Sequence, residues 1–352
     1  LWKLNEIITL AGDPHSSFGF FGSYGDLIAY EEYFPLQIRL INNQFVVINP
    51  MINKDKVSKR DVLVSINEIP TNQILQDIYA HIPAQAHIKN GKKGMFNAFQ
   101  DNYIPYSLNF PKSYQIKIKG KTKSIELTSI KEKPTYFPMI SPKSPCQKQY
   151  CLNKLNNSTV LLTLRSFDFY GDKFNQVIDF LDISFKTIEE ENYQNLIIDI
   201  RGNLGGTSAI GRHLLKHTLS EPFQFFSQSD FEIPKTENPF KNNFKGKIVV
   251  LMNGDGFSSV GQLASIYKDK NRVTFIGETL GSNQFCTANQ KQFELTNTKF
   301  KYTVARNIFI TDVQEKDPKA TIEPDIEIEQ SIDDFLSDKD VVLEKAIELT
   351  EK

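Results

Sequence analysis

Two adjacent serines stand where an apolar run ends and a helical pattern begins. Residues 252–267 read MNGDGFSSVGQLASIY, and Ser258 and Ser259 occupy the turn between the two patterns. A serine at a strand-to-helix turn has an exposed hydroxyl, and the N–H of the next residue lies near it as half of an oxyanion hole. A single serine here is more often the N-cap of the helix. With two serines, one can cap the helix while the other acts as a nucleophile.

A glycine-rich turn lies at the preceding strand-to-helix junction, in the stretch IIDIRGNLGGTSAIGRHLL. Gly202, Gly205 and Gly206 follow an apolar strand and come before a helix that we expect from Thr207. Glycines allow a tight turn whose N–H groups point outward beside the positive end of the helix dipole. Such a turn can bind a phosphate, a carboxylate or the oxyanion of a tetrahedral intermediate, or it can be a plain tight turn. Its spacing excludes a dinucleotide-binding fingerprint and a P-loop.

Three of the five histidines bear on the chemistry. His15, in GDPHSSF, follows Pro14 in a turn between structured segments, which is one way to present an imidazole. His213 and His217 are four residues apart on an expected helix, as metal-binding pairs are. Leu214 replaces the glutamate of H-E-x-x-H, and no third ligand is evident in the sequence. We therefore expect no metal site and no cofactor.

The composition is that of an ordinary globular protein of two or three domains. Among 352 residues, 41 are basic and 42 acidic, so the net charge of -1 gives no field that would hold nucleic acid or an anionic membrane. No run of about 18 apolar residues occurs, which predicts no membrane-spanning helix. Cys146 and Cys151 lie five positions apart in a proline-containing loop and can close a small disulfide if the compartment is oxidising.

The order of sequence patterns divides the chain into four parts. Residues 1–22 begin with a short helix that breaks at a glycine and a proline, and this break delivers His15 into a loop. Residues 23–133 read as short strands with a hairpin and a helix, and residues 134–157 are a proline-containing linker. Residues 158–352 alternate apolar strands with helices, which predicts an α/β core whose sheet is covered by helices.

Together these motifs resemble the tail-specific, or C-terminal processing, protease family of serine peptidases, S41, which includes the tricorn core protease. NLIIDIRGNLGG is similar to the family's D-L-R-x-N-x-G-G turn, and VVLMNGDGFSSVGQLA to its strand followed by T-A-S-A-S-E. VTFIGETLGS and ATIEPDIEI extend the likeness over about residues 158–330. The resemblance implies a β-β-α superhelical core like those of Clp-type peptidases and crotonases.

The family's pattern places its nucleophile on Ser259. It implies an oxyanion hole formed by the N–H groups of Val260 and of Gly205 or Gly206. Members with a Ser-Lys dyad carry lysine where this chain has Ser282, so a lysine base is absent.

The branch that contains tricorn uses histidine, and AGDPHSS resembles its histidine segment, which implies that His15 is the base. The acid that orients this base is then expected shortly before ATIEPD, at Asp317 or at Glu315.

The resemblance implies a serine endopeptidase that hydrolyses polypeptide substrates through an acyl-enzyme. VSKRDVLVSINEIPT is similar to the last strands of a PDZ-like domain, but Arg60 and Glu68 replace two glycines, so this domain is either a peptide site or a spacer. A catalytically impaired peptide-binding module is the main alternative, and a crotonase-like acyl-CoA enzyme is a more distant one. Likeness to bacterial envelope members implies export, to the periplasm or as a lipoprotein.

Overall fold

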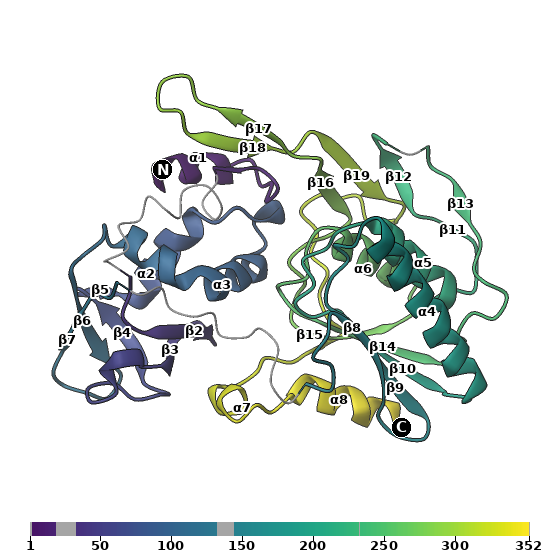
Figure 1. Ribbon diagram of the computed structural model, residues 1–352, viewed down its shortest axis with the longest axis horizontal. Coiled ribbons are helices and arrows are strands. Elements are labelled where there is room, and N and C mark those ends of the chain that lie inside the picture. Colours follow the sequence, from purple (N-terminus) through teal and green to yellow (C-terminus); the bar gives the residue numbers. More distant parts are fainter. Residues whose placement is uncertain (1, 19–32, 132–143, 232, 352) are drawn as a thin grey trace.

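The computed structural model describes residues 2–18, 33–131, 144–231 and 233–351, which form a β-rich domain and a larger α/β domain (Figure 1). The predicted four-part division itself stays a prediction. The predicted boundaries at residues 22 and 133, and the linker up to residue 143, lie outside the described residues. The end of the predicted linker is wrong, because Tyr150–Lys154 is an edge strand of the core sheet.

The α/β domain is built on one six-stranded sheet with the order β20-β15-β14-β10-β9-β8. All neighbouring pairs are parallel except β8 with β9. The strands are β8 (Tyr150–Lys154), β9 (Thr159–Leu164), β10 (Asn195–Asp199), β14 (Lys247–Met252), β15 (Thr274–Gly277) and β20 (Ile326–Glu327). The central strands are nearly continuous apolar runs, as expected for strands with both faces covered.

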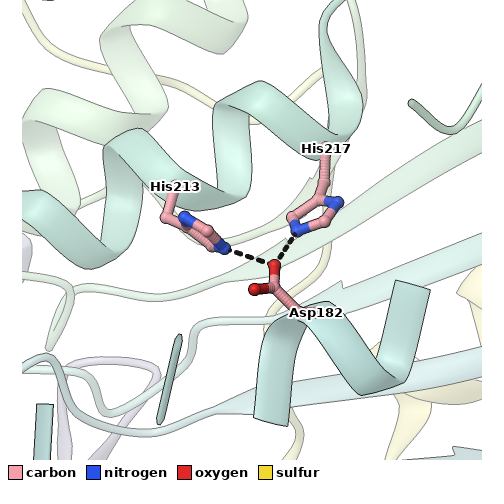
Figure 2. A group of neighbouring side chains, drawn as sticks. All are labelled: Asp182, His213 and His217. Atoms are coloured by element: carbon pink, nitrogen blue, oxygen red, sulfur yellow. Dashed lines mark hydrogen bonds and ion pairs between the residues drawn. The ribbon is translucent and has the colours of Figure 1, made fainter. Parts of the chain in front are cut away.

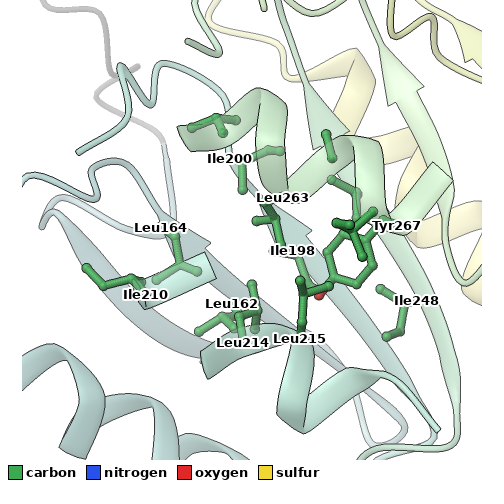
Figure 3. Close-up of a cluster of buried hydrophobic side chains, with 14 of the residues drawn as sticks. Leu162, Leu164, Ile198, Ile200, Ile210, Leu214, Leu215, Ile248, Leu263 and Tyr267 are labelled. Atoms are coloured by element: carbon green, nitrogen blue, oxygen red, sulfur yellow. The ribbon is translucent and has the colours of Figure 1, made fainter. Parts of the chain in front are cut away.

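Alternate residues of these strands belong to two separate cores. Leu162, Ile198 and Ile248 pack under α5 (Ser208–Thr218) and α6 (Ser259–Asp269), as Figure 3 shows. This larger core also includes residues of α4 (Asp172–Glu190). The other face packs against α8 (Val341–Thr350). The two-residue period of a strand thus divides the sheet between helices on both sides.

The β-rich domain has its own core and its own sheet, in the order β2-β3-β4-β6-β7 with β5 beside β4. Its elements are β2 (Gln37–Ile41), β3 (Gln44–Asn49), β4 (Val62–Ile66), β5 (Ile69–Pro70), α2 (Thr71–Ala80), α3 (Lys89–Ser107), β6 (Ser113–Ile118) and β7 (Ile125–Thr128). Arg60 and Glu68 have φ angles of 83° and 65°, the left-handed conformation that glycine favours. This backbone matches the glycine positions of the PDZ-like pattern, and the PDZ-like assignment itself stays a prediction.

Helix α3, which the sequence did not predict, places the β-rich domain against the α/β domain. A Cβ added at Gly94 would lie 2.0 Å from Oδ1 of Asp255, and one added at Gly91 would lie 3.4 Å from the carbonyl oxygen of Gly281. Lys93 forms ion pairs with Glu278 and Glu329. The β-rich domain therefore contacts the loop that follows β14, five residues or fewer from the paired serines.

The start of the chain is tied to the α/β domain by a small sheet of three strands. Helix α1 (Trp2–Thr9) is followed by β1 (Ser17–Phe18), which pairs with β18 (Lys301–Val304), and β18 pairs with β17 (Lys291–Glu294). In Figure 1 this hairpin projects from the α/β domain and runs beside α1. His15 lies between α1 and β1, so the hairpin holds the segment that carries it.

The remaining elements complete the α/β domain. A second three-stranded sheet consists of β12 (Phe226–Ser229), β19 (Asn307–Thr311) and β16 (Phe285–Ala288). A short pair joins β11 (Phe223–Gln224) to β13 (Thr236–Glu237), and α7 (Ile332–Leu336) precedes α8. Cys146 and Cys151 are joined in a disulfide. Within the described ranges, no helix is both long and apolar enough to cross a bilayer.

Candidate active site

The structure brings His15 and the paired serines together, although 243 positions separate His15 from Ser258. Nε2 of His15 lies 3.3 Å from Oγ of Ser258, and the imidazole stacks on the ring of Phe257 at 4.6 Å between centroids. His15 thus contacts Ser258 and not Ser259. Oγ of Ser259 is buried and has no hydrogen-bond partner in the described part of the chain.

The backbone explains why the first serine, and not the second, faces the histidine. Ser258 has φ 57° and ψ -122°, a conformation that is strained for a residue with a side chain. This conformation directs the side chain of Ser258 toward His15, as the turns between a strand and a helix do in enzymes that present a nucleophile there. Ser259 is the first residue of α6, and its side chain points into the buried interior.

A hydrogen-bond network on the far side of the imidazole holds it in place. Nδ1 of His15 lies 3.1 Å from Oγ1 of Thr287, and this hydroxyl donates to Oδ1 of Asp13 at 2.5 Å. Asp13 also accepts the hydroxyl of Ser16 at 2.5 Å and the backbone N–H of His15 at 2.9 Å. A carboxylate that accepts three hydrogen bonds is fixed in position.

This network determines which ring nitrogen of the neutral imidazole carries the proton. The Thr287 hydroxyl has one hydrogen, which it donates to Asp13. Toward His15 the hydroxyl oxygen can therefore only accept a hydrogen bond. Nδ1 of His15 must then be the donor, and Nε2 is left with a lone pair facing Ser258. The pKa of His15 is below its ordinary value of 6.5, because burial lowers it by more than the negative charge of Asp13 raises it. The imidazole is therefore neutral at pH 7 and can act as a base.

Cys286 is the other polar group on Ser258. Its Sγ lies 3.4 Å from Oγ of Ser258. Burial raises the pKa of Cys286 to about 11, so the group is a thiol at neutral pH and does not compete for the proton of the serine.

The glycine turn packs directly against Ser258. A Cβ at Gly205 would lie 2.7 Å from Cβ of Ser258, and φ of Gly205 is 90°, so only glycine fits here. Asn203, fully buried, braces the turn by accepting from the N–H of Gly205 and donating to the carbonyl of Leu164. Its own carbonyl accepts the N–H of Phe257. The two junctions singled out in the sequence thus form one site.

The structure corrects two of the three predicted oxyanion donors. The N–H of Gly205 already donates to Oδ1 of Asn203, and the N–H of Val260 already donates to the carbonyl of Phe257. The N–H of Gly206 donates no hydrogen bond within the described residues. The N–H of Ser259 heads α6, where the first N–H groups have no partner inside the helix.

The predicted acids do not reach the histidine. Asp317 and Glu315 are exposed and are bound within their own loop, where Glu315 accepts the N–H of Asp317 and Asp317 accepts that of Lys319. Among the contacts of the described residues, neither carboxylate touches His15. The carboxylate that does lie near Nδ1, at 3.8 Å, is Asp13, two residues before His15. Asp13 was within the quoted GDPHSSF motif, whereas nothing in the sequence pointed to Thr287.

The position of the absent lysine is filled by a small buried side chain. Ser282 is 1% exposed and donates its hydroxyl to the carbonyl of Gly256. A Cβ at Gly261 would lie 2.5 Å from this hydroxyl, so the first turn of α6 packs tightly on Ser282. The ring nitrogen beside Ser258 is thus that of His15, and Ser282 stands at the position where the sequence lacks a lysine.

Comparison with known proteins supports a peptidase. A family model described as peptidase family S41 matches residues 159–328. No curated protein matches the chain in sequence.

Two solved structures of CPAF show the same fold. A mutant of CPAF superposes with a TM-score of 0.65 at 12% identity, over 99% of this chain and 86% of that one. Mature CPAF complexed with lactacystin superposes with a TM-score of 0.61 at 12% identity, over 99% and 86%. The photosystem II D1 C-terminal processing protease is more distant, with a TM-score of 0.44 at 15% identity, over 93% and 81%. The chain matches peptidase family S41 over residues 159–328 and is a serine peptidase.

Proposed function

We propose that this peptidase is an endopeptidase in which Ser258 is the nucleophile and His15 the base. The observation that carries the proposal is the 3.3 Å approach of Nε2 of His15 to Oγ of Ser258, made by an imidazole whose proton is fixed on Nδ1. The family pattern alone favoured Ser259, and its buried, unpartnered hydroxyl argues against it.

In the acylation step, Oγ of Ser258 attacks the carbonyl carbon of the substrate and its proton passes to Nε2 of His15. The resulting imidazolium then gives this proton to the leaving amine as the C–N bond breaks. Water then attacks the acyl carbon while Nε2 of His15 takes its proton, and the bond from this carbon to Oγ of Ser258 breaks as Nε2 returns the proton to Oγ. Thr287 and Asp13 orient the imidazole of His15 and stabilise its positive charge. This is the role that the sequence assigned to Asp317 or Glu315.

We assign the oxyanion hole to the N–H groups of Ser259 and Gly206. Gly205 brings the turn that contains Gly206 within van der Waals contact of Ser258, and Ser259 follows the nucleophile directly. Each effective donor of this kind lowers the barrier by about 3 to 4 kcal/mol.

The substrates are proteins or peptides, as for the family, and we propose that the chain acts outside the cytoplasm. The disulfide between Cys146 and Cys151 supports an oxidising compartment such as the bacterial envelope.

Labelling with a fluorophosphonate, which reacts with activated serines, tests the nucleophile. Wild type and Ser259→Ala should be labelled, and Ser258→Ala and His15→Ala should not. Labelling of Ser258→Ala but not of Ser259→Ala would restore the assignment made from the family pattern. No labelling of any folded form would favour the catalytically impaired peptide-binding module.

A further inference from the structure

A second group of convergent side chains lies away from the active site, between α4 and α5. Nε2 of His213 lies 2.6 Å from Oδ1 of Asp182, and Nε2 of His217 lies 2.8 Å from the same oxygen. In Figure 2 the two imidazoles project from one helix toward a single carboxylate on the facing helix. The ligand atoms of all three residues lie within 4.8 Å of one another.

Aromatic packing holds both rings with Nε2 toward Asp182. His217 stacks on Phe185 at 4.3 Å with an interplanar angle of 2°, and Phe240 packs against both histidines. The side chain of His217 is 6% exposed and that of His213 is 15% exposed.

We propose that Asp182, His213 and His217 bind a divalent transition metal ion, with zinc as the ion whose chemistry they fit. Two imidazole nitrogens and one carboxylate oxygen form a three-ligand set that leaves a fourth position to water. The sequence showed the two histidines but not the third ligand, because Asp182 lies 31 residues before His213 on another helix.

The rearrangement required of the carboxylate is small. Bonds of about 2.0 to 2.1 Å at tetrahedral angles separate two ligand atoms by about 3.3 Å. The carboxylate must therefore move back from each nitrogen by about 0.6 Å. The side chain of Asp182 is 52% exposed and can make this movement without disturbing the core.

The ion would join α4 to α5, the helix that follows the glycine turn at Gly205 and Gly206. Nδ1 of His217 has no hydrogen-bond partner within the described residues, so no acceptor orients this ring from behind. Loss of such an acceptor typically lowers metal affinity by about 10- to 100-fold. We therefore expect zinc affinity about 10- to 100-fold weaker than that of a three-ligand site whose imidazoles are all oriented in this way.

The test uses the full chain, free of any histidine tag, in a titration with Zn²⁺ against a chromophoric chelator. Wild type should bind one equivalent of zinc, and Asp182→Asn and His213→Ala should each lose at least about tenfold in affinity. Asp172→Asn is the matched control, because it removes the same charge from the same helix about 15 Å away. In thermal unfolding, zinc at about 100 times its dissociation constant should shift the folding equilibrium of wild type, but not of Asp182→Asn, by about 100-fold.

His15→Ala should bind zinc as wild type does. Loss of binding in that variant, with binding intact in Asp182→Asn, would place the ion at the active site and overturn the proposal. Absence of zinc binding by the folded wild type would show that the three residues are only a hydrogen-bonded clasp between the helices.

Discussion

Thr287 is the residue through which the proposed mechanism is best tested, because it joins His15 to Asp13 without touching the substrate's reacting atoms. Replacement by valine keeps the shape of the side chain and removes the hydroxyl. Nδ1 of His15 then loses its acceptor, since Asp13 is 3.8 Å from it and too far for a hydrogen bond. The side chain of His15 is 8% exposed, so water does not readily replace the threonine.

Two effects determine how far kcat/KM falls in Thr287→Val. A hydrogen bond from a charged donor is roughly twice as strong as a neutral one, so the imidazolium formed in the transition state loses about 1 to 1.5 kcal/mol more than the neutral ring. The bias toward the Nδ1–H tautomer, worth about 1 kcal/mol, is lost as well. Together these give about 2 to 2.5 kcal/mol, or roughly a 30- to 70-fold fall in kcat/KM.

The assay is the initial rate of cleavage of a fluorogenic peptide, with kcat and KM resolved, alongside the rate of fluorophosphonate labelling. We expect Thr287→Val to lower kcat and the labelling rate together while KM changes little. Thr287→Ser, which keeps the hydroxyl, should stay close to wild type, and melting temperatures of all three forms check that they fold. If Thr287→Val remains within about threefold of wild type, or if Thr287→Ser is equally impaired, the relay has no part in orienting His15.

Three further outcomes follow from the same structure. Because burial lowers the pKa of His15 and Asp13 raises it, Asp13→Asn should move the acid limb of kcat/KM to lower pH while reducing its plateau; an unchanged limb, measured from pH 4 to 9, would contradict the assigned ion pair. Arg201 donates to both carboxylate oxygens of Asp340 at 2.8 Å, and Asp340→Asn keeps the cap on Leu343 but removes the charge. Because Arg201 stays paired with Asp199, urea unfolding should show a loss of about 1.5 kcal/mol, and no measurable loss would mean that the pair is solvent-screened. Thiol titration of the denatured, unreduced protein should find one free thiol, that of Cys286, whereas three would show that the disulfide does not form.

The sequence predicted the α/β core well because strong local signals marked its elements. The apolar strands around Ile198 and Val250, and the helices from Ser208 and from Ser259, begin and end close to where their patterns indicate. Helix α3 was missed because Gly91, Gly94 and Pro105 are poor helix formers. The two glycines are there for contact with the other domain, and a contact made across domains leaves no periodic signal in the sequence.

For the site, the sequence identified the segments but not the individual groups. Residue types and motif likeness pointed to His15, to the paired serines and to the glycine turn. Which serine faces the base depends on the φ of 57° at Ser258, which no pattern of residue types encodes. The third member of the relay, Thr287, comes from a strand 272 positions away from His15 and carries no distinguishing motif. Asp182 escaped notice for the same reason.

The small sheet in which β18 pairs with β1 has a consequence for the order in which the protein becomes active. His15 is synthesised before its contacts, since Ser258, Thr287 and the strand that secures its segment come 243 to 286 positions later. Contacts so distant along the chain form late, because the loop between them must first be closed. No nascent chain that ends before Val304 can hold His15 against Ser258 in the way described. The proposed site can therefore assemble only after Val304 has been synthesised.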